Sequence, residues 1–213
     1  MSVPETAVTT RRDSFLFIRD AVPADYPAIR DVIAAAYGQY RYLIAGGVFE
    51  PYLADLLDVE RHAHHGRWFI VENDGQVRGA VAFYPDASVQ GFGLPPRWAG
   101  ARALAIHPAA RGRGIARALL ATCERLARDS GAPAFAFHTA SFMTSAIALY
   151  ERLPYRRAPE FDFDMAARFG GSAAAPIMAI AYFRRLNTPP GSAPVAGRST
   201  ARTPVSHPTR RIR

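Results

Sequence analysis

Two glycines at the predicted start of a helix, flanked by arginines, have the spacing that most directly suggests chemistry. Gly112 and Gly114 lie in the segment LAIHPAARGRGIA (residues 104–116), where an apolar strand gives way to a helical pattern. The first backbone N–H groups of a helix lack partners within it and carry the positive end of its dipole, so this turn is suited to bind an anion. Because glycine has no Cβ, the main chain there can approach a diphosphate closely. Arginines in and after the turn add positive charge: Arg111, Arg113 and Arg117.

The glycine spacing differs from that of two common phosphate-binding motifs. No Lys-Ser/Thr pair follows the glycines, as a P-loop requires, and the spacing is not that of a dinucleotide-binding Gly-x-Gly-x-x-Gly turn. Taken alone, the turn indicates a phosphate site without defining its ligand.

The hydrophobic pattern predicts the elements that position this turn. Strands are expected at 15–19, 67–73, 77–84, 101–106, 134–138, 161–165 and 177–183, and helices at about 23–37, 49–57, 115–130 and 144–152. This order predicts an α/β fold with a mixed sheet and helices on its faces. One domain is expected over residues 14–186, with a loose arm at 1–13 and a Pro/Ser/Thr/Arg-rich tail at 187–213.

Two linked motifs resemble the signatures of the GCN5-related N-acetyltransferase (GNAT) family. Residues 111–116 (RGRGIA) are similar to the family's (Gln/Arg)-x-x-Gly-x-(Gly/Ala) motif, and residues 146–151 (AIALYE) resemble its Ala-x-x-Leu-Tyr-Glu motif. The family usually continues with Gly-Phe, where this sequence has Leu-Pro-Tyr-Arg at 153–156. The resemblance implies a mostly antiparallel sheet of about seven strands. Its fourth and fifth strands, at 101–106 and 134–138, would splay apart to admit acetyl-CoA.

The same resemblance implies which residues bind the cofactor. The fourth strand would hold the pantetheine arm through its backbone, as an edge strand holds a partner strand, and the amides of the turn would hold the pyrophosphate. The residues expected to make these contacts are Leu104, Ala105, Ile106, Arg111, Gly112, Arg113, Gly114, Ile115, Ala116 and Arg117. A backbone N–H near Ala105 or Ile106 is also expected to stabilise an oxyanion. Acetyl-CoA is therefore the expected cosubstrate.

Tyr150 corresponds to the general acid of the family. A thiolate leaving group, whose thiol has a pKa of about 8.5, can take a proton from a nearby phenol with a pKa of about 10. The alternative is that Tyr150 is a core aromatic at the end of a helix. His138 is a candidate general base, because its position at the end of the fifth strand matches a carboxylate in some members, but a structural histidine is an equal alternative. Met143 replaces an asparagine that often contacts the cofactor in the family.

Several polar and aromatic groups have simpler interpretations. His62, His64 and His65 suggest a metal site, but no nearby cysteine or clear third ligand completes it, so we expect a solvated helix end and no metal. Cys123 lies on the apolar stripe of a helix and is expected to be a buried thiol. A set of aromatic residues and a pair of aspartates each have more than one interpretation. Tyr37, Tyr40, Tyr42, Phe49 and Tyr52 are core or acceptor-pocket residues, and Asp162 and Asp164 are expected on the solvated face of a strand.

Composition limits the partners. All 26 basic residues are arginine, which is typical of a GC-rich bacterial genome, and five of them lie in the acid-free segment 187–213. The rest of the chain carries 21 basic and 18 acidic residues, so a basic nucleic-acid-binding face is not expected. No apolar stretch is long enough for a membrane helix and no signal peptide is evident. A single cysteine suits a reducing compartment, so the cytoplasm is the expected location.

The sequence thus predicts an acetyl-CoA-dependent N-acetyltransferase that acts on a small-molecule or peptide amine by direct attack in a ternary complex. The acceptor is left open, and related domains often pair as homodimers through their C-terminal strands. A non-catalytic acyl-CoA-binding regulator is the alternative. A weaker one is a nucleic-acid-associated protein guided by the arginine-rich tail.

Overall fold

The computed structural model describes residues 17–44, 47–171 and 176–186. The predicted arm (1–13) and tail (187–213) lie outside the described residues. The strands are β1 (Phe17–Asp20), β2 (Arg67–Asn73), β3 (Gln76–Tyr84), β4 (Ala99–Ile106), β5 (Ala134–Ala140), β6 (Arg156–Arg157), β7 (Phe163–Asp164) and β8 (Met178–Arg185). The helices are α1 (Tyr26–Tyr37), α2 (Phe49–Leu57), α3 (Val59–His65), α4 (Ile115–Asp129), α5 (Thr144–Glu151) and α6 (Met165–Phe169).

These strands form one mixed sheet in the order β1-β2-β3-β4-β5-β8-β6, with β7 also paired to β8. All pairs are antiparallel except β4 and β5, which run parallel. The α/β class and mixed sheet predicted from the sequence are confirmed. The strands expected at 67–73 and 77–84 form a hairpin, and the two residues of its turn, Asp74 and Gly75, both have positive φ.

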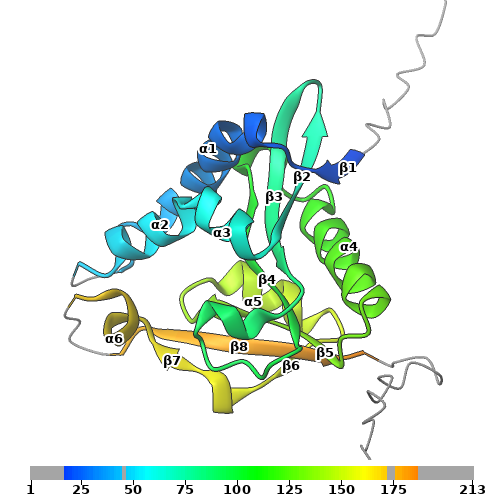
Figure 1. The fold of residues 1–213 in the computed structure, drawn as a ribbon. Coiled ribbons are helices and arrows are strands. Elements are labelled where there is room, and N and C mark those ends of the chain that lie inside the picture. Colours follow the sequence, from blue (N-terminus) through cyan, green and yellow to red (C-terminus); the bar gives the residue numbers. More distant parts are fainter. Residues whose placement is uncertain (1–16, 45–46, 172–175, 187–213) are drawn as a thin grey trace, which may run out of the picture.

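Helices cover both faces of the sheet, so its central strands are apolar on both sides. Alternate residues of β2 face two separate cores: Trp68 and Ile70 pack with α1 and α2, whereas Phe69 and Val71 pack with α4. In Figure 1, α1, α2 and α3 lie on one side of β2 and β3, and α4 lies on the other. A strand buried on both faces has a continuous apolar run in its sequence, as β2 has at residues 68–71 (WFIV).

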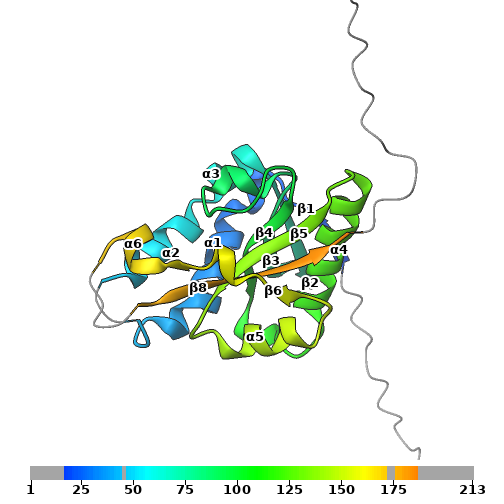
Figure 2. The same ribbon diagram turned by 90° about the horizontal axis from the view of Figure 1, so that it is seen from below.

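The sheet opens between β4 and β5. Only Ala99 and Gly100 of β4 pair with β5, although β4 continues to Ile106. The two halves of the sheet accordingly run in different directions, with β5 and β8 crossing the direction of β2 and β3 (Figures 1 and 2). A bulge accompanies this opening: the register with β3 shifts between Ala80 and Ala82. Ala103, on the bulged stretch of β4, has φ +52°, a left-handed conformation that L-residues rarely adopt.

The C-terminal part of the domain differs most from the prediction. The expected strand 161–165 is replaced by a 3₁₀ turn (Pro159–Phe161), the two-residue β7 and the short helix α6. Asp164 causes this change, because its carboxylate accepts a hydrogen bond from the Ala166 backbone N–H and caps α6. Asp162 is not solvated as expected: it pairs with Arg157 and accepts a hydrogen bond from the Ala181 N–H. Helix α3 and strand β6 were not predicted as separate elements.

Candidate active site

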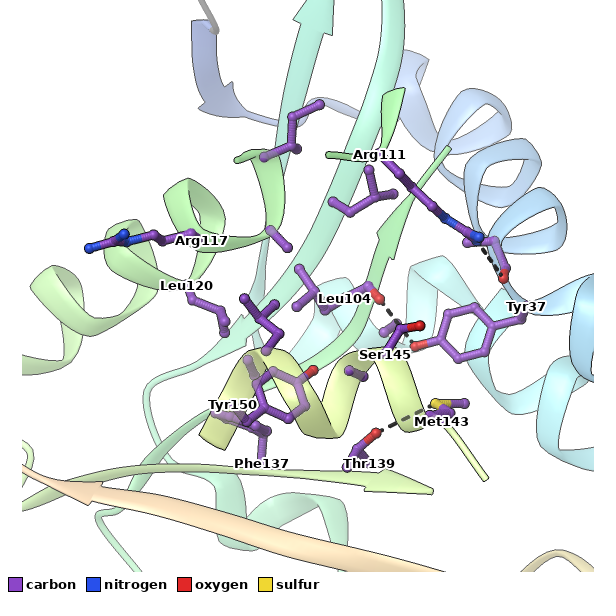
Figure 3. A pocket seen from close by; sticks show the side chains of 18 of the residues that line it. Tyr37, Leu104, Arg111, Arg117, Leu120, Phe137, Thr139, Met143, Ser145 and Tyr150 are labelled. Carbon is purple, nitrogen blue, oxygen red and sulfur yellow. Dashed lines mark hydrogen bonds between the residues drawn. The ribbon is translucent and has the colours of Figure 1, made fainter. Parts of the chain in front are cut away.

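A cavity of about 420 Å³ lies where β4 and β5 separate. Its wall includes the end of α1, the turn before α4, the start of α4, and parts of β4, β5 and α5 (Figure 3). Most residues that sequence reasoning placed at the site line this cavity: Leu104, Ile106, Arg111, Gly112, Gly114, Ile115, Ala116, Arg117, His138 and Tyr150. Two do not. The side chain of Ala105 is buried in the core against α1, and that of Arg113 is exposed to solvent.

The turn before α4 presents a row of free backbone donors. Gly114 is the N-cap of α4, and the first helical hydrogen bond runs from the Ala118 N–H to the Gly114 carbonyl. The six amides of residues 112–117 donate to no acceptor among the described residues. Gly112 and Gly114 have φ of +75° and +80°, and a Cβ at either would meet nothing within 4 Å. Glycine is thus favoured here by backbone conformation, and the space above the amides is open to an anion.

The arginines around the turn differ in what they contact. Arg111 reaches across the cavity to the C-terminal end of α1, where its guanidinium donates to the Ala36 carbonyl and the Gln39 side chain, both at 3.2 Å. This contact places a cation at the negative end of the α1 dipole. In Figure 3, the side chain of Arg117 extends away from the other labelled side chains. The turn is therefore surrounded by positive charge. The guanidinium of Arg111 contributes to this charge, but it is already hydrogen-bonded to Ala36 and Gln39.

Tyr150 projects its hydroxyl into the cavity from α5. Its ring packs against Phe137, with ring centroids 4.6 Å apart, and against Tyr182. The hydroxyl points away from Phe137 toward Leu104 and Ser145 (Figure 3) and has no hydrogen-bond partner among the described residues. Burial raises the pKa of Tyr150 above its ordinary value, so the phenol stays protonated at neutral pH. The arrangement is an uncommitted O–H donor in a largely apolar pocket.

His138 contributes a ring with one nitrogen occupied. Its Nε2 lies 2.9 Å from the Phe161 carbonyl oxygen, so Nε2 carries the proton and Nδ1 holds the lone pair in the neutral ring. The ring makes edge contacts with Phe92 and Phe163. Burial lowers the pKa of His138, although the Phe161 carbonyl partly opposes this effect. At neutral pH the imidazole is a free base held in one orientation.

Leu104 lies in the part of β4 that does not pair with β5. Its carbonyl oxygen accepts a hydrogen bond from the Tyr37 hydroxyl at 3.2 Å (Figure 3). Tyr37, Tyr40 and Tyr52 all line the cavity, whereas Phe49 is core and Tyr42 is 93% exposed. Tyr37 and Tyr52 are both core and cavity-lining, so the two alternatives do not exclude each other, and the exposed Tyr42 fits neither.

A buried polar network that the sequence analysis missed lies at the other end of the cavity from the glycine turn. Arg102, a charged residue in the apolar strand β4, lines the cavity and pairs with Asp55 of α2. His62 belongs to the same network and is 1% exposed, so the expectation of a solvated helix end was wrong for it. Its Nε2 is hydrogen-bonded to the Asp55 carbonyl in the preceding helix, and its Nδ1 to the hydroxyl of Tyr84, 22 residues away in β3. A lone arginine within an apolar strand was the available sequence signal.

Other candidates have structural surroundings. Met143 is 5% exposed and lines the cavity, with the Thr139 hydroxyl donating to its sulfur at 3.5 Å. Cys123 is buried, as predicted, and burial raises the pKa of its thiol. Within residues 17–44, 47–171 and 176–186, no group of three or more His, Cys, Asp or Glu side chains could hold a metal ion. The same residues contain no helix of the length and apolarity needed to cross a membrane.

Comparison with known proteins identifies the family. The family model described as "Acetyltransferase (GNAT) family" matches residues 28–155, which is more than half of the chain. The chain belongs to this family, and the resemblance seen in its motifs is confirmed. Its members transfer acyl groups, and the open β4–β5 pair and the free amides before α4 lie within the matched range.

Two curated relatives illustrate the similarity. The "Uncharacterized N-acetyltransferase YjgM" of Escherichia coli (strain K12) is 31% identical over 133 residues, covering 62% of this chain and 76% of that protein. "N-acetyltransferase family 8 member 2" of Rattus norvegicus is 30% identical over 125 residues, covering 55% of this chain and 52% of that protein. The chain spans about half the length of the mammalian relatives it matches.

Solved structures share the fold at low sequence identity. The ribosomal-protein-alanine N-acetyltransferase from Brucella melitensis has a TM-score of 0.56 and 21% identity, covering 80% of this chain and 100% of that chain. The structure of yncA from Salmonella typhimurium, solved with its cofactor acetyl-CoA, has the same TM-score and identity, covering 82% of this chain and 95% of that chain. These matches support the GNAT fold.

Proposed function

We propose that this protein transfers an acetyl group from acetyl-CoA to a primary amine by direct attack within a ternary complex. The observation that carries the proposal is the single cavity that joins the free amides of residues 112–117 to the unpartnered hydroxyl of Tyr150. An anion site and a proton donor in one cavity match the two ends of an acyl-CoA: a diphosphate and a thioester sulfur.

The residues present fit acetyl-CoA as a substrate. The amides before α4 would hold the diphosphate through backbone donors and the helix dipole. The separation of β4 from β5 beyond Gly100 leaves the β4 main chain as an edge along the cavity. Such an edge can pair with the amide groups of a pantetheine arm. The relative yncA, solved with acetyl-CoA, supports this assignment.

Tyr150 would donate the proton to the leaving sulfur. The thioester supplies the acetyl group and a thiolate leaving group. The same apolar surroundings that raise the pKa of the phenol also disfavour a thiolate, so the proton transfer stays nearly balanced in the cavity. Ordinary pKa values of about 10 and about 8.5 make this step only mildly uphill in water.

His138 would accept the proton that the attacking amine releases. An ammonium has no lone pair, so the amine must lose a proton before or during attack. The neutral imidazole has its free Nδ1 available, and hydrogen bonding of Nε2 to the Phe161 carbonyl orients the ring. We propose that His138 acts directly or through one water.

Direct attack is supported by the state of the only thiol. An acyl-enzyme formed on cysteine would need a reactive thiolate, and Cys123 is the single cysteine of the chain. Its side chain is 0% exposed and its pKa is raised by burial, so it is not available as a thiolate. The amine is therefore proposed to attack the thioester itself.

A screen for transfer tests the proposal. Purified protein is incubated with acetyl-CoA and a panel of amines, and the release of free CoA is measured against a no-amine control. Amine-dependent CoA release is the expected result. Tight acetyl-CoA binding without turnover on any amine would instead support the regulatory alternative.

A further inference from the structure

The charges on the cavity wall are all of one sign. Its lining residues include four arginines and, within the described part of the chain, neither aspartate nor glutamate. Arg111 and Arg117 belong to the turn and the start of α4, and Arg152 follows α5. Arg102 differs from these because it belongs to β4. It precedes Leu104 by two residues, whereas the glycine turn follows Leu104. Its charge is thus at the end where the acceptor would meet the thioester.

The guanidinium of Arg102 is held by two contacts, but some of its N–H donors have no acceptor among the described residues. Its side chain is 10% exposed, and its charged end lies 4.4 Å from the centre of the Phe92 ring. Only its Nη2 has a partner among the described residues, the carboxylate of Asp55. No buried side-chain nitrogen in the described residues lacks a partner, so the remaining Arg102 donors must reach accessible space. The cavity that Arg102 lines provides that space.

Asp55 does not fully neutralise this arginine. Its carboxylate is shared with Arg61, which approaches from the exposed side and is absent from the cavity wall. His62 carries no charge at neutral pH, because burial lowers its pKa to about 4. An arginine with free donors in an apolar pocket is a strong site for a carboxylate, because its planar fork matches two carboxylate oxygens.

We propose that the acetyl acceptor is an α-amino acid with an apolar side chain, whose carboxylate is bound by Arg102. This inference rests on the proposed transferase activity. The wall near Arg102 includes Tyr37, Tyr52 and Leu56, which supply apolar surface for the acceptor side chain. Two strand residues span only about 7 Å, so a short acceptor whose amine and carboxylate are close together fits between Arg102 and the Leu104 region.

The same charges argue against polycationic acceptors. A polyamine or an aminoglycoside brings further ammonium groups beside its reacting amine. The described cavity wall offers them no carboxylate and would place them near the Arg102 guanidinium. Like charges at close range in an apolar site repel strongly. Such amines are therefore expected to be poor substrates.

Matched pairs of amines test the proposal. Each pair is an amino acid and its decarboxylated form: leucine with 3-methylbutylamine, and phenylalanine with phenethylamine. Rates are compared at equal concentrations of unprotonated amine, so that differences in amine pKa are removed. We expect kcat/KM to be higher for the amino acid by about tenfold or more, as for a hydrogen bond to a charged group. Equal or reversed preference within both pairs would overturn the proposal.

Variants of two arginines locate the effect. Arg102→Met should lower kcat/KM for leucine by about tenfold or more and change that for 3-methylbutylamine by less than about threefold. Arg61→Met removes the other cation on Asp55 without touching the cavity wall, and should leave the preference unchanged. Arg102→Lys keeps the charge and the pairing with Asp55 but loses the planar fork, so it serves if Arg102→Met fails to fold. Unchanged leucine kinetics in a folded Arg102 variant would overturn the proposal.

A binding measurement separates this inference from the proposed activity. Leucine and 3-methylbutylamine are titrated calorimetrically into protein saturated with CoA, where no transfer occurs. Leucine binding that is lost in Arg102→Met supports the carboxylate site even if no transfer activity is found. Transfer to amines without selective leucine binding would keep the transferase and overturn the role of Arg102. Absence of leucine binding in a protein that also lacks activity would overturn both.

Discussion

Removing the hydroxyl of Tyr150 is expected to affect catalysis almost alone. The hydroxyl makes no hydrogen bond among the described residues, and the ring provides the packing against Phe137 and Tyr182. Tyr150→Phe keeps that ring. The free energy of unfolding should therefore change by no more than about 0.5 kcal/mol. The loss of a general acid typically costs about 10²–10⁴ in rate, so kcat should fall by about a hundredfold or more.

A neighbouring tyrosine provides the matched control. The Tyr155 ring lies 6.2 Å from that of Tyr150, but its hydroxyl donates to the buried carboxylate of Glu124 at 2.6 Å. Tyr155→Phe breaks this hydrogen bond to a charged group, which should lower the free energy of unfolding by about 1.5–3 kcal/mol. Because Tyr155 does not line the cavity, kcat of the folded variant should stay near the wild-type value.

The assay combines three measurements on both variants. Steady-state CoA release gives kcat, calorimetry gives the Kd for acetyl-CoA, and urea denaturation gives stability. Tyr150→Phe should lose kcat with its acetyl-CoA Kd within about twofold of wild type, and Tyr155→Phe should lose stability instead. A wild-type kcat in Tyr150→Phe, or an equal loss of kcat in both variants, would refute the role of Tyr150 as general acid.

Three further predictions concern the turn, His138 and the buried His62. Gly114→Ala should raise the acetyl-CoA Kd about tenfold or more in calorimetry, because its Cβ enters the space above the amides. Gly131→Ala, at the other end of α4 with φ +71° and equally open surroundings, carries the same backbone strain of about 1–2 kcal/mol and should leave the Kd unchanged. His138→Gln should lower kcat about a hundredfold. In the wild-type protein, kcat should decrease as the pH falls below 6.5, since the pKa of His138 is lowered. This acid limb of the pH profile should be absent in His138→Gln. A limb that persists in His138→Gln would assign this histidine a structural role. The pKa of His62 is about 4 in the folded protein against about 6.5 when unfolded, so the unfolded chain takes up the proton first as the pH falls. Stability should be complete above pH 6.5 and decrease by about 3 kcal/mol toward pH 4 in urea titrations. His62→Gln should flatten most of this slope, with a remainder from His138. An equally steep slope in His62→Gln would contradict this origin.

Local signals in the sequence were sufficient for strand β2 and for the turn before α4. Strand β2 was predicted at its observed bounds, Arg67–Asn73, because an apolar run ends at an Asp-Gly turn. The start of α4 was predicted from Gly112 and Gly114, whose left-handed conformation is observed. These features depend on neighbours in the chain, so the pattern of a short segment was enough.

Features that depend on distant partners were missed. His62 reads as a polar helix end, but its Nδ1 is bonded to Tyr84, 22 residues away, and it is buried. The sequence pattern predicts a solvated Asp162, but its carboxylate accepts a hydrogen bond from the Ala181 backbone N–H in β8. Arg102 pairs with Asp55 of α2, which only the tertiary fold brings to β4. Burial of a polar group is decided by its partners, and a single sequence does not show them.

The central claim is that one cavity holds the diphosphate at the turn before α4 and the thioester beside Tyr150. A crystal structure with a non-hydrolysable acetyl-CoA analogue tests it most directly. We expect diphosphate oxygens within hydrogen-bond distance of the amides of residues 112–117, with the atom that replaces the sulfur about 3–3.5 Å from the Tyr150 hydroxyl. A bound analogue with its diphosphate away from this turn, or with Tyr150 turned from the acyl end, would contradict it.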